Sequence, residues 1–248
     1  MNNITQQTTI GLVIAKNIKA AQIFDEYGVN IGRENTTSIA EVCEKHNIEC
    51  DEVLSKISKL PPPLENAQPD FLNMPLDELT QYIVKNHHKF LYQHVPEMEK
   101  YLEAAVEEQK NEFPALTDAL KSFKDFEEIM YRHLKLEEKE YFPFVCDMVK
   151  IANKEAPFQG GFEQTAEEYI ETLVDDHRRA SKLVNKTCRF VKYKNPPKNA
   201  GENYIKFIQL VNALHQDIFL HITLEDSVLQ PKSIILEQQL NALQKYGA

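Results

Sequence analysis

The sequence of 248 residues has only 7 glycines, no tryptophan and fewer basic than acidic side chains. So few glycines leave little material for glycine-rich phosphate loops or for the many turns of an all-β barrel. The 38 acidic and 28 basic residues give a net charge of −10, which argues against nucleic acid and against an anionic membrane as partners. The remaining composition, with 27% charged and 42% hydrophobic residues, is typical of a soluble globular protein with a real core.

Long apolar runs are also absent. No stretch of about 18 apolar residues could span a membrane, and the opening MNNITQQTTIG lacks the basic start and apolar stretch of a signal peptide. The cysteines are scattered and form no C-x-x-C pair; they are Cys43, Cys50, Cys146 and Cys188. We therefore expect free thiols in a reducing cytoplasm.

Prolines divide the chain. The run from Pro61 to Pro63, followed by Pro69 and Pro75, should exclude helix, because proline lacks a backbone N–H and restricts the residue before it. We predict a small helical domain over 1–60, a proline-rich linker over 61–75 and a large helical domain over 76–248.

In the small domain, apolar spacing predicts one helix over 10–27 and a third helix from Asp51. Between them a capping box, in which Ser38 and Glu41 satisfy free N–H groups reciprocally, predicts a helix that begins at Ser38.

The large domain shows long stretches of helical periodicity with short interruptions and no sustained alternation of the β type. Long helices with short connections favour an antiparallel four-helix bundle, so the predicted fold class is all-α. The expected helices cover about 76–110, 117–149, 161–192 and 203–229, with a break at Pro231 and a short tail helix over about 232–245.

Two segments of the large domain repeat the same pattern. HLKLEEKEYFP begins at His133 and HITLEDSVLQP at His221, and in both a Glu follows at +4, a second acid at +5 and a proline at +10. Residues at i and i+4 share a helix face, so His133 with Glu137, and His221 with Glu225, present two metal-binding groups together.

Two further histidines occur at matching distances upstream, since His88 precedes His133 by 45 residues and His177 precedes His221 by 44. The large domain is therefore interpreted as two copies of a helical hairpin, each of which supplies one His and one His/Glu pair. The paired positions lie on apolar stripes that include Phe126, Met130 and Tyr141 on one helix and Leu214, Ile218 and Val228 on the other.

Inward carboxylates need a cation, because buried charge is costly unless it is paired or bound to metal. Four imidazoles and two bridging carboxylates suit a pair of irons, whereas zinc is less suited and manganese or mixed metals stay open. The alternative is surface histidines paired with carboxylates on acidic helices. The predicted metal ligands are His88, His133, Glu137, His177, His221 and Glu225.

With these motifs, nearly the whole chain resembles the hemerythrin-like di-iron proteins that repair iron–sulfur clusters. The resemblance lies in His87-His88 followed by Val95-Pro96-Glu97, in Asp176-His177, in the two H-x-x-x-E segments and in the LEDSVLQP stretch. Ordinary hemerythrins carry additional histidines, so an oxygen carrier is a poorer match.

The small domain resembles the ScdA-type domain of the same family, in Tyr27-Gly28-Val29 and in the helix from Ser38 to Cys43. The family usually has adjacent cysteines there, whereas this chain has Gly32-Arg33-Glu34-Asn35. A thiol or metal-handling role of this domain is therefore not expected, and Cys43 is expected to be packed.

The resemblance implies two non-haem irons with an oxo or hydroxo bridge and repair of iron–sulfur clusters damaged by nitrosative or oxidative stress. Repair would proceed by iron donation or by reduction of nitric oxide, a nitric oxide reductase activity. The implied partners are damaged iron–sulfur proteins and a diatomic ligand, NO or O2, with a homodimer as the implied assembly. The alternative is a hemerythrin-like sensor or storage module without turnover.

The other histidines receive structural interpretations. We expect His87 and His94 to be exposed to solvent, with a second metal site on a shared helix face as the alternative, and His215 to be a hydrogen-bonded helix residue. His46 should lie at a helix end, where it interacts with the helix dipole.

Overall fold

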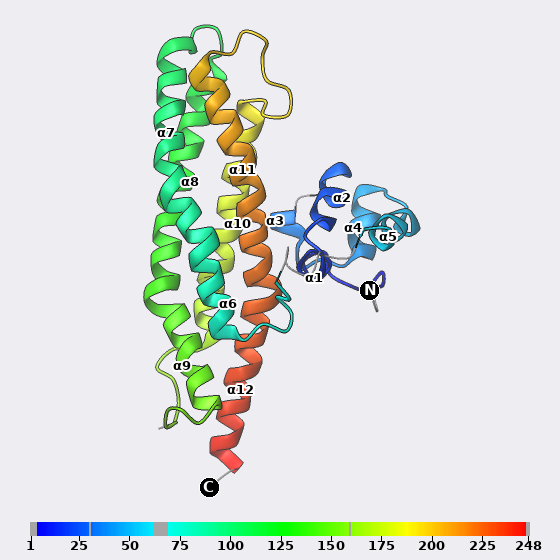
Figure 1. Ribbon diagram of the computed structural model, residues 1–248, viewed down its shortest axis with the longest axis vertical. Coiled ribbons are helices and arrows are strands. Elements are labelled where there is room, and N and C mark those ends of the chain that lie inside the picture. The colour runs from blue at the N-terminus through cyan, green and yellow to red at the C-terminus, as the bar shows by residue number, and fades with distance from the viewer. Residues whose placement is uncertain (1–3, 30, 62–68, 159, 247–248) are drawn as a thin grey trace. The chain divides into compact units, whose positions relative to one another are not determined.

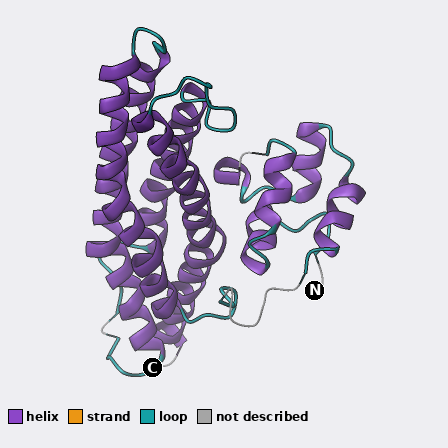
Figure 2. Cartoon of the chain, turned by 45° about the horizontal axis from the view of Figure 1, so that its top comes forward, coloured by secondary structure: helices purple, strands orange, loops and turns teal. Residues whose placement is uncertain are grey.

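A computed structural model describes the chain except for residues 1–3, 30, 62–68, 159 and 247–248. The part described is helical and contains no strand, as Figure 2 shows. Residues 62–68 of the predicted linker lie outside the described residues. The all-α prediction is confirmed.

The chain forms two compact units. Each unit is built from separate segments that alternate along the sequence with those of the other unit. The first comprises Met1–Gln81, Tyr141–Glu171 and Leu220–Ala248, and the second comprises Tyr82–Glu140 and Thr172–Phe219.

The second unit is a four-helix bundle, in which the long helices run side by side (Figure 1). Its helices are α7 (Lys89–Gln109), α8 (Ala115–Leu136), the larger part of α10 (Ala166–Phe190) and the larger part of α11 (Glu202–Leu224). The rings of Phe123 on α8 and Phe207 on α11 meet edge to face at 5.4 Å, and Ser122 of α8 donates to the carbonyl of Leu183 on α10. These contacts close the core of the bundle.

In its described residues, the first unit contains five short helices near the N-terminus and three helices from later in the chain. The short helices are α1 (Ile10–Lys16), α2 (Ala20–Glu26), α3 (Ile31–Glu34), α4 (Ile39–His46) and α5 (Cys50–Ser58). The later ones are α6 (Leu76–Ile83), α9 (Phe142–Ala152) and α12 (Gln230–Tyr246). The hydroxyl of Tyr141 lies 2.9 Å from that of Ser233 on α12, and the Thr80 hydroxyl of α6 lies 3.6 Å from the Cys146 sulfur of α9.

The N-terminal helix prediction is wrong in one respect. Residues 10–27 form two helices, because Asn17 takes an extended backbone (φ −153°) and its side chain binds elsewhere. Its amide donates to the carbonyl of Pro61 at 3.0 Å and its oxygen accepts from the backbone of Lys19. The capping box at Ser38 and Glu41 is confirmed, since both of its hydrogen bonds are present.

The break predicted at Pro231 is also wrong. The chain continues from α11 through η3 (Glu225–Leu229) into α12 without leaving the helix, and likewise from α8 through η2 (Glu137–Tyr141) into α9. Both η segments are π-helical turns, and Pro143 and Pro231 each lie two residues beyond one of them. A widened turn displaces the carbonyl that the proline ring would otherwise meet, so the helix can pass through.

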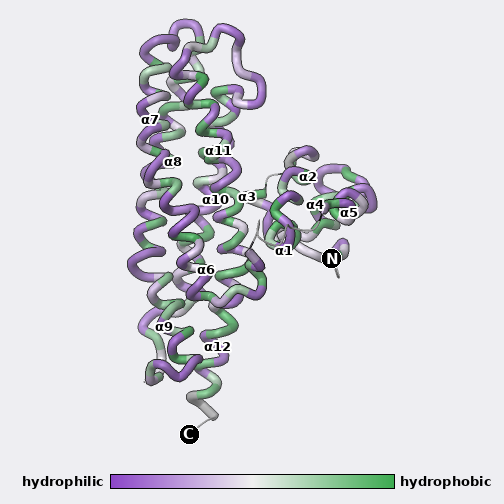
Figure 3. Tube along the Cα trace, viewed as in Figure 1, coloured by the Kyte–Doolittle hydropathy of each residue, from purple (hydrophilic) through white to green (hydrophobic). Residues whose placement is uncertain are grey.

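The predicted apolar stripes are confirmed. Figure 3 shows hydrophobic and hydrophilic residues alternating along the long helices, as one buried face per helix requires. Phe126, Met130 and Tyr141 have exposed fractions of 0–1%, and so do Leu214 and Ile218. The His and Glu residues of these stripes therefore point into the core.

Candidate metal centre

Glu137 is the centre of a cluster in the second unit. One of its carboxylate oxygens lies 3.3 Å from Nε2 of His88 and 3.2 Å from Nε2 of His133. Nε2 of His177 lies 3.1 Å from Nε2 of His133. Because all four side chains are at most 1% exposed, three ring nitrogens and a carboxylate converge at a point that solvent does not reach.

A second pair lies on the continuous helix formed by α11 and η3. Nε2 of His221 is 2.7 Å from a carboxylate oxygen of Glu225, and both side chains have no exposed surface. This is the i, i+4 geometry predicted from the sequence.

The six side chains provide two groups of potential ligand atoms. Within each group, all ligand atoms lie within 4.8 Å of one another. One group contains His88 and His221 and the other His133 and His177, and Glu137 and Glu225 belong to both. Imidazole and carboxylate donors suit a transition metal, and buried carboxylates in an apolar core are costly without a cation. The cluster therefore fits a metal site.

Three of the six residues lie in π-helical turns. His88 ends η1 (Val84–His88), Glu137 begins η2, and Glu225 begins η3. A π-turn inserts one extra residue, which rotates the following side chains by about 100° relative to a regular α-helix. Such turns often occur at functional sites, and here each of them carries a residue of the cluster.

The electrostatics of Glu137 reflect two opposing effects. Burial alone would raise the pKa of its carboxyl, but the attraction of His133 and the hydrogen bonds from His133 and His88 lower the pKa well below 4.5. Glu137 is therefore a carboxylate, the form that binds metal.

Glu138, the second acid of the first repeat, orients His88. Its carboxylate lies 2.9 Å from Nδ1 of His88, while Nε2 on the other side of the same ring faces Glu137. The hydrogen bond from His88 lowers the pKa of Glu138. Glu138 also accepts from Tyr92, which is 44% exposed and whose pKa is raised to about 12, chiefly by desolvation. The sequence motif contains Glu138, but only the structure shows its role.

An ion pair lies beside the histidines of α8 and α10. Arg132 donates to Asp176 at 2.5 Å, and Arg179 lies 3.8 Å from the same carboxylate oxygen. Arg132 precedes His133 and Asp176 precedes His177, so the pair fixes the register of the two helices where these rings meet.

The exposure predicted for His87 is wrong. Its ring is 3% exposed, and its Nδ1 lies 2.8 Å from a carboxylate oxygen of Asp217 on α11. Sequence reasoning missed this pair because 130 residues separate its members.

For the other histidines, the hydrogen bond predicted for His215 and the helix-end position predicted for His46 are confirmed, whereas His94 is only partly exposed. His94 is 26% exposed and lies 3.6 Å from Glu97. His215 lies 3.2 Å from the side-chain oxygen of Asn185, and His46 at the end of α4 lies 3.0 Å from Glu34.

The cysteines are free and Cys43 is packed, as predicted. Cys43, Cys50, Cys146 and Cys188 are free thiols, and Cys43 is buried.

With this geometry established, comparison with known proteins identifies the family. The hemerythrin HHE cation binding domain matches residues 79–233, which include all six residues of the cluster. The chain belongs to this family. The four-helix bundle of the second unit is the fold expected of a hemerythrin domain, and a cation-binding role agrees with the buried His/Glu cluster.

Relatives match well beyond the hemerythrin domain. The iron-sulfur cluster repair protein ScdA of Staphylococcus epidermidis is 24% identical over 232 residues, which cover 92% of this chain and 99% of that protein. ScdA of Staphylococcus haemolyticus is 22% identical over 228 residues, which cover 91% of this chain and 97% of that protein. The iron-sulfur cluster repair protein YtfE of Salmonella typhimurium is 23% identical over 219 residues, which cover 87% of this chain and 91% of that protein. The resemblance drawn from the motifs is confirmed.

Within the part of the chain that the structure covers, no helix combines the length and the apolar character needed to cross a membrane.

Proposed function

We propose that this hemerythrin-family protein holds two non-haem irons and takes part in the repair of damaged iron–sulfur clusters. The observation that supports two ions is that Glu137 and Glu225 belong to both groups of ligand atoms. A carboxylate shared by two groups can bridge two ions, and each ion then also receives two histidines. The function of the relatives named above supports cluster repair.

The six proposed ligands divide their tasks. His88 and His221 would hold one iron, His133 and His177 the other, and Glu137 and Glu225 would bridge. Iron in such a site supplies Fe(II)/Fe(III) redox chemistry and a coordination position for NO or O2.

The residues around the proposed ligands would favour metal binding in two ways. Glu138 keeps the proton of His88 on Nδ1, away from the metal-binding nitrogen. Phe126 and Ile218, both without exposed surface, exclude bulk water from the stripes that carry the ligands.

Two routes of repair are compatible with this site. In the first, iron is cargo that the protein donates to a damaged iron–sulfur protein. In the second, iron at the centre would supply two electrons from an external donor to two NO, which with two protons would give nitrous oxide and water and so remove the damaging agent. We place the protein in the cytoplasm, where the four free thiols remain reduced. The division into 1–60, 61–75 and 76–248 and the homodimer remain predictions.

Metal analysis tests the centre directly. Anaerobically loaded protein should contain two irons per chain, and Glu137→Leu and Glu225→Leu should each lower this number. Glu140→Leu is the matched control, because Glu140 lies on the same π-turn as Glu137 but is exposed. Two irons retained in both ligand variants would refute the assignment.

A second measurement separates the routes. Reduced protein is mixed with NO under anaerobic conditions, with an excess of an added electron donor that returns the irons to Fe(II), and nitrous oxide is followed over many turnovers. Sustained formation supports NO reduction, and transfer of iron to a cluster protein without turnover supports donation. A ligand-dependent change in partner binding with neither result would identify a sensor.

A further inference from the structure

A segment of strongly positive charge occurs in this acidic chain. Between residues 177 and 201 there are eight basic residues and no acidic one. The rest of the chain therefore carries 20 basic against 38 acidic residues, a net charge of −18. The proposed metal centre and the predicted motifs do not account for this concentration of positive charge.

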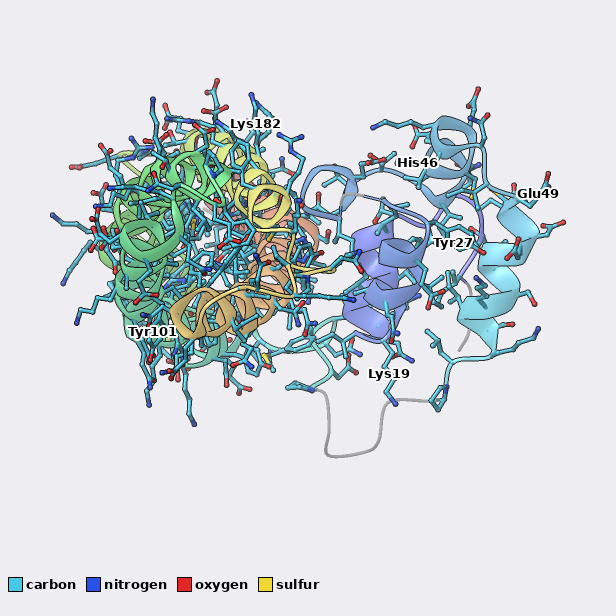
Figure 4. All side chains as sticks on the ribbon, turned by 90° about the horizontal axis from the view of Figure 1, so that it is seen from above. Lys19, Tyr27, His46, Glu49, Tyr101 and Lys182 are labelled. Carbon is cyan, nitrogen blue, oxygen red and sulfur yellow. The ribbon has the colours of Figure 1, made fainter. Side chains whose placement is uncertain are left out.

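The structure arranges four of these charges on one face of α10. At 100° per residue, Arg178, Lys182, Lys186 and Arg189 fall within an arc of about 80°. All four side chains are exposed, and Lys182 points away from the bundle in Figure 4. We call these four residues, together with Lys192 just beyond the helix, the cationic face.

Most of the cationic face is not neutralised. Arg178 lies 3.0 Å from Asp175 of its own helix. Among the described residues, no carboxylate lies within ion-pair distance of Lys182, Lys186 or Arg189. The helix dipole favours cations only in the last turn of a helix, which explains Arg189 but not Lys182 and Lys186.

The cationic face ends in a hollow. An open cavity of about 350 Å³ lies at the carboxyl end of α10, where three cations surround a half-buried tyrosine. Tyrosine and arginine are enriched in protein interfaces, and a hollow offers a place for a projecting partner side chain. The cavity is lined by Cys188, Arg189, Lys192, Tyr193, Lys194 and Asn195.

The face lies on the helix that carries His177. Its first residue, Arg178, follows His177 directly, and at 1.5 Å per residue the face extends about 17 Å along the helix to Arg189. A molecule bound there would rest on a helix that carries one of the proposed iron ligands.

We propose that the cationic face docks an acidic surface of a folded protein, and that this partner is an iron–sulfur protein served by the centre, a choice that rests on the proposed function. Charge complementarity selects the occupant. An extended polyanion that continued beyond the face would meet the net charge of −18 elsewhere on the chain. A compact acidic surface of about 800 Å² can cover the face and stop there.

Charge reversal tests the proposal. The probe is a plant-type [2Fe–2S] ferredoxin of strongly negative net charge, titrated calorimetrically into the iron-loaded full chain in 50 mM salt. Wild-type protein should bind it, and Lys182→Glu/Lys186→Glu should weaken binding at least tenfold. The control is Lys100→Glu/Lys121→Glu, which changes the net charge equally at exposed lysines on α7 and α8 and should weaken binding less than threefold.

Salt and competitors complete the test. In 0.5 M salt the difference between the variants should fall below twofold, because screening then acts over a few ångströms. Equal weakening in both double variants, or no binding by wild-type protein, overturns the proposal. Tighter binding of a 20-base-pair DNA or of phosphatidylserine vesicles, lost in Lys182→Glu/Lys186→Glu, would assign the face to that ligand instead.

Iron content distinguishes the two proposals. The face variant should retain as much iron as wild-type protein, so that lost binding reports docking. Wild-type protein that binds the ferredoxin but holds no iron would refute the proposed function and leave the docking surface in place.

Discussion

Glu138→Gln tests how the protein prepares the proposed site for metal. The substitution keeps the size of the side chain and one acceptor oxygen, but it removes the charge that faces Nδ1 of His88 at 2.9 Å. His88 would then be held in its metal-binding tautomer less firmly. Such partners of metal-binding histidines typically contribute 10- to 100-fold in affinity.

The structure places the expected effect at the lower end of this range. A hydrogen bond to a charged group contributes about 1.5–3 kcal/mol, but the Glu138 side chain is 29% exposed and water screens part of its charge. We therefore expect iron affinity to fall by about tenfold, or ~1.4 kcal/mol. The control Glu140→Gln removes the same charge from the same π-turn at an exposed position and should leave affinity within about twofold.

The assay is an anaerobic competition of each variant with a chromophoric Fe(II) chelator. Equal affinities of Glu138→Gln and Glu140→Gln would refute the role assigned to Glu138. The metal-free protein gives a second readout through pH. The folded pKa of Glu138 is lowered from 4.5, so its stabilising effect should be full above pH 4.5 and lost as the pH falls through the lower folded value. A stability difference between wild-type protein and Glu138→Gln that grows on acidification would contradict this.

Three further predictions concern stability and reactivity. In Gly11→Ala the new Cβ would lie 1.9 Å from the hydroxyl of Ser227, so urea unfolding should show a loss of about 1–3 kcal/mol, whereas Ser227→Ala alone should cost less. The pKa of the buried Cys188 is raised to about 12 from 9.0, so its thiolate fraction at pH 8, and its alkylation rate by mass spectrometry, should be about a thousandfold below that of a free thiol. Tyr141→Phe removes the bond to Ser233 and should lower the free energy of unfolding by about 1 kcal/mol.

The ligand-bearing stripes were predictable from the sequence because they depend on local periodicity. His133 and Glu137 share a helix face whatever the rest of the chain does, and the second copy at His221 and Glu225 repeats the pattern. The burial of both pairs follows from the apolar residues on the same stripes.

The π-turns were not predictable in the same way. An i, i+4 pattern looks the same whether the turn that begins at Glu137 is α-helical or π-helical, and Pro231 suggested a helix end. The helix continues because a widened turn precedes each proline, a feature that depends on the packing of the whole site.

Tertiary contacts explain the remaining differences. The acid at +5 occurs in both repeats, yet Glu138 binds His88, whereas Asp226 accepts from Asn35 of the N-terminal region at 3.1 Å. His87 is buried because Asp217 meets it from a distant helix. No local pattern contains such partners, so the sequence shows which residues are chemically able to act but not which ones meet.

The proposed ligands also destabilise the folded protein when no metal is bound. Six fully or almost fully buried polar side chains occupy positions where apolar residues would pack well, and three of them lie in π-turns. Both features disfavour folding without metal, since buried charge and departures from the α-helix are costly. A ligand that binds only the folded state stabilises it by about 4 kcal/mol at a thousandfold excess over its dissociation constant. Iron binding would therefore stabilise the bundle while leaving its core chemically active, which is why such residues can persist at the centre of a helical fold.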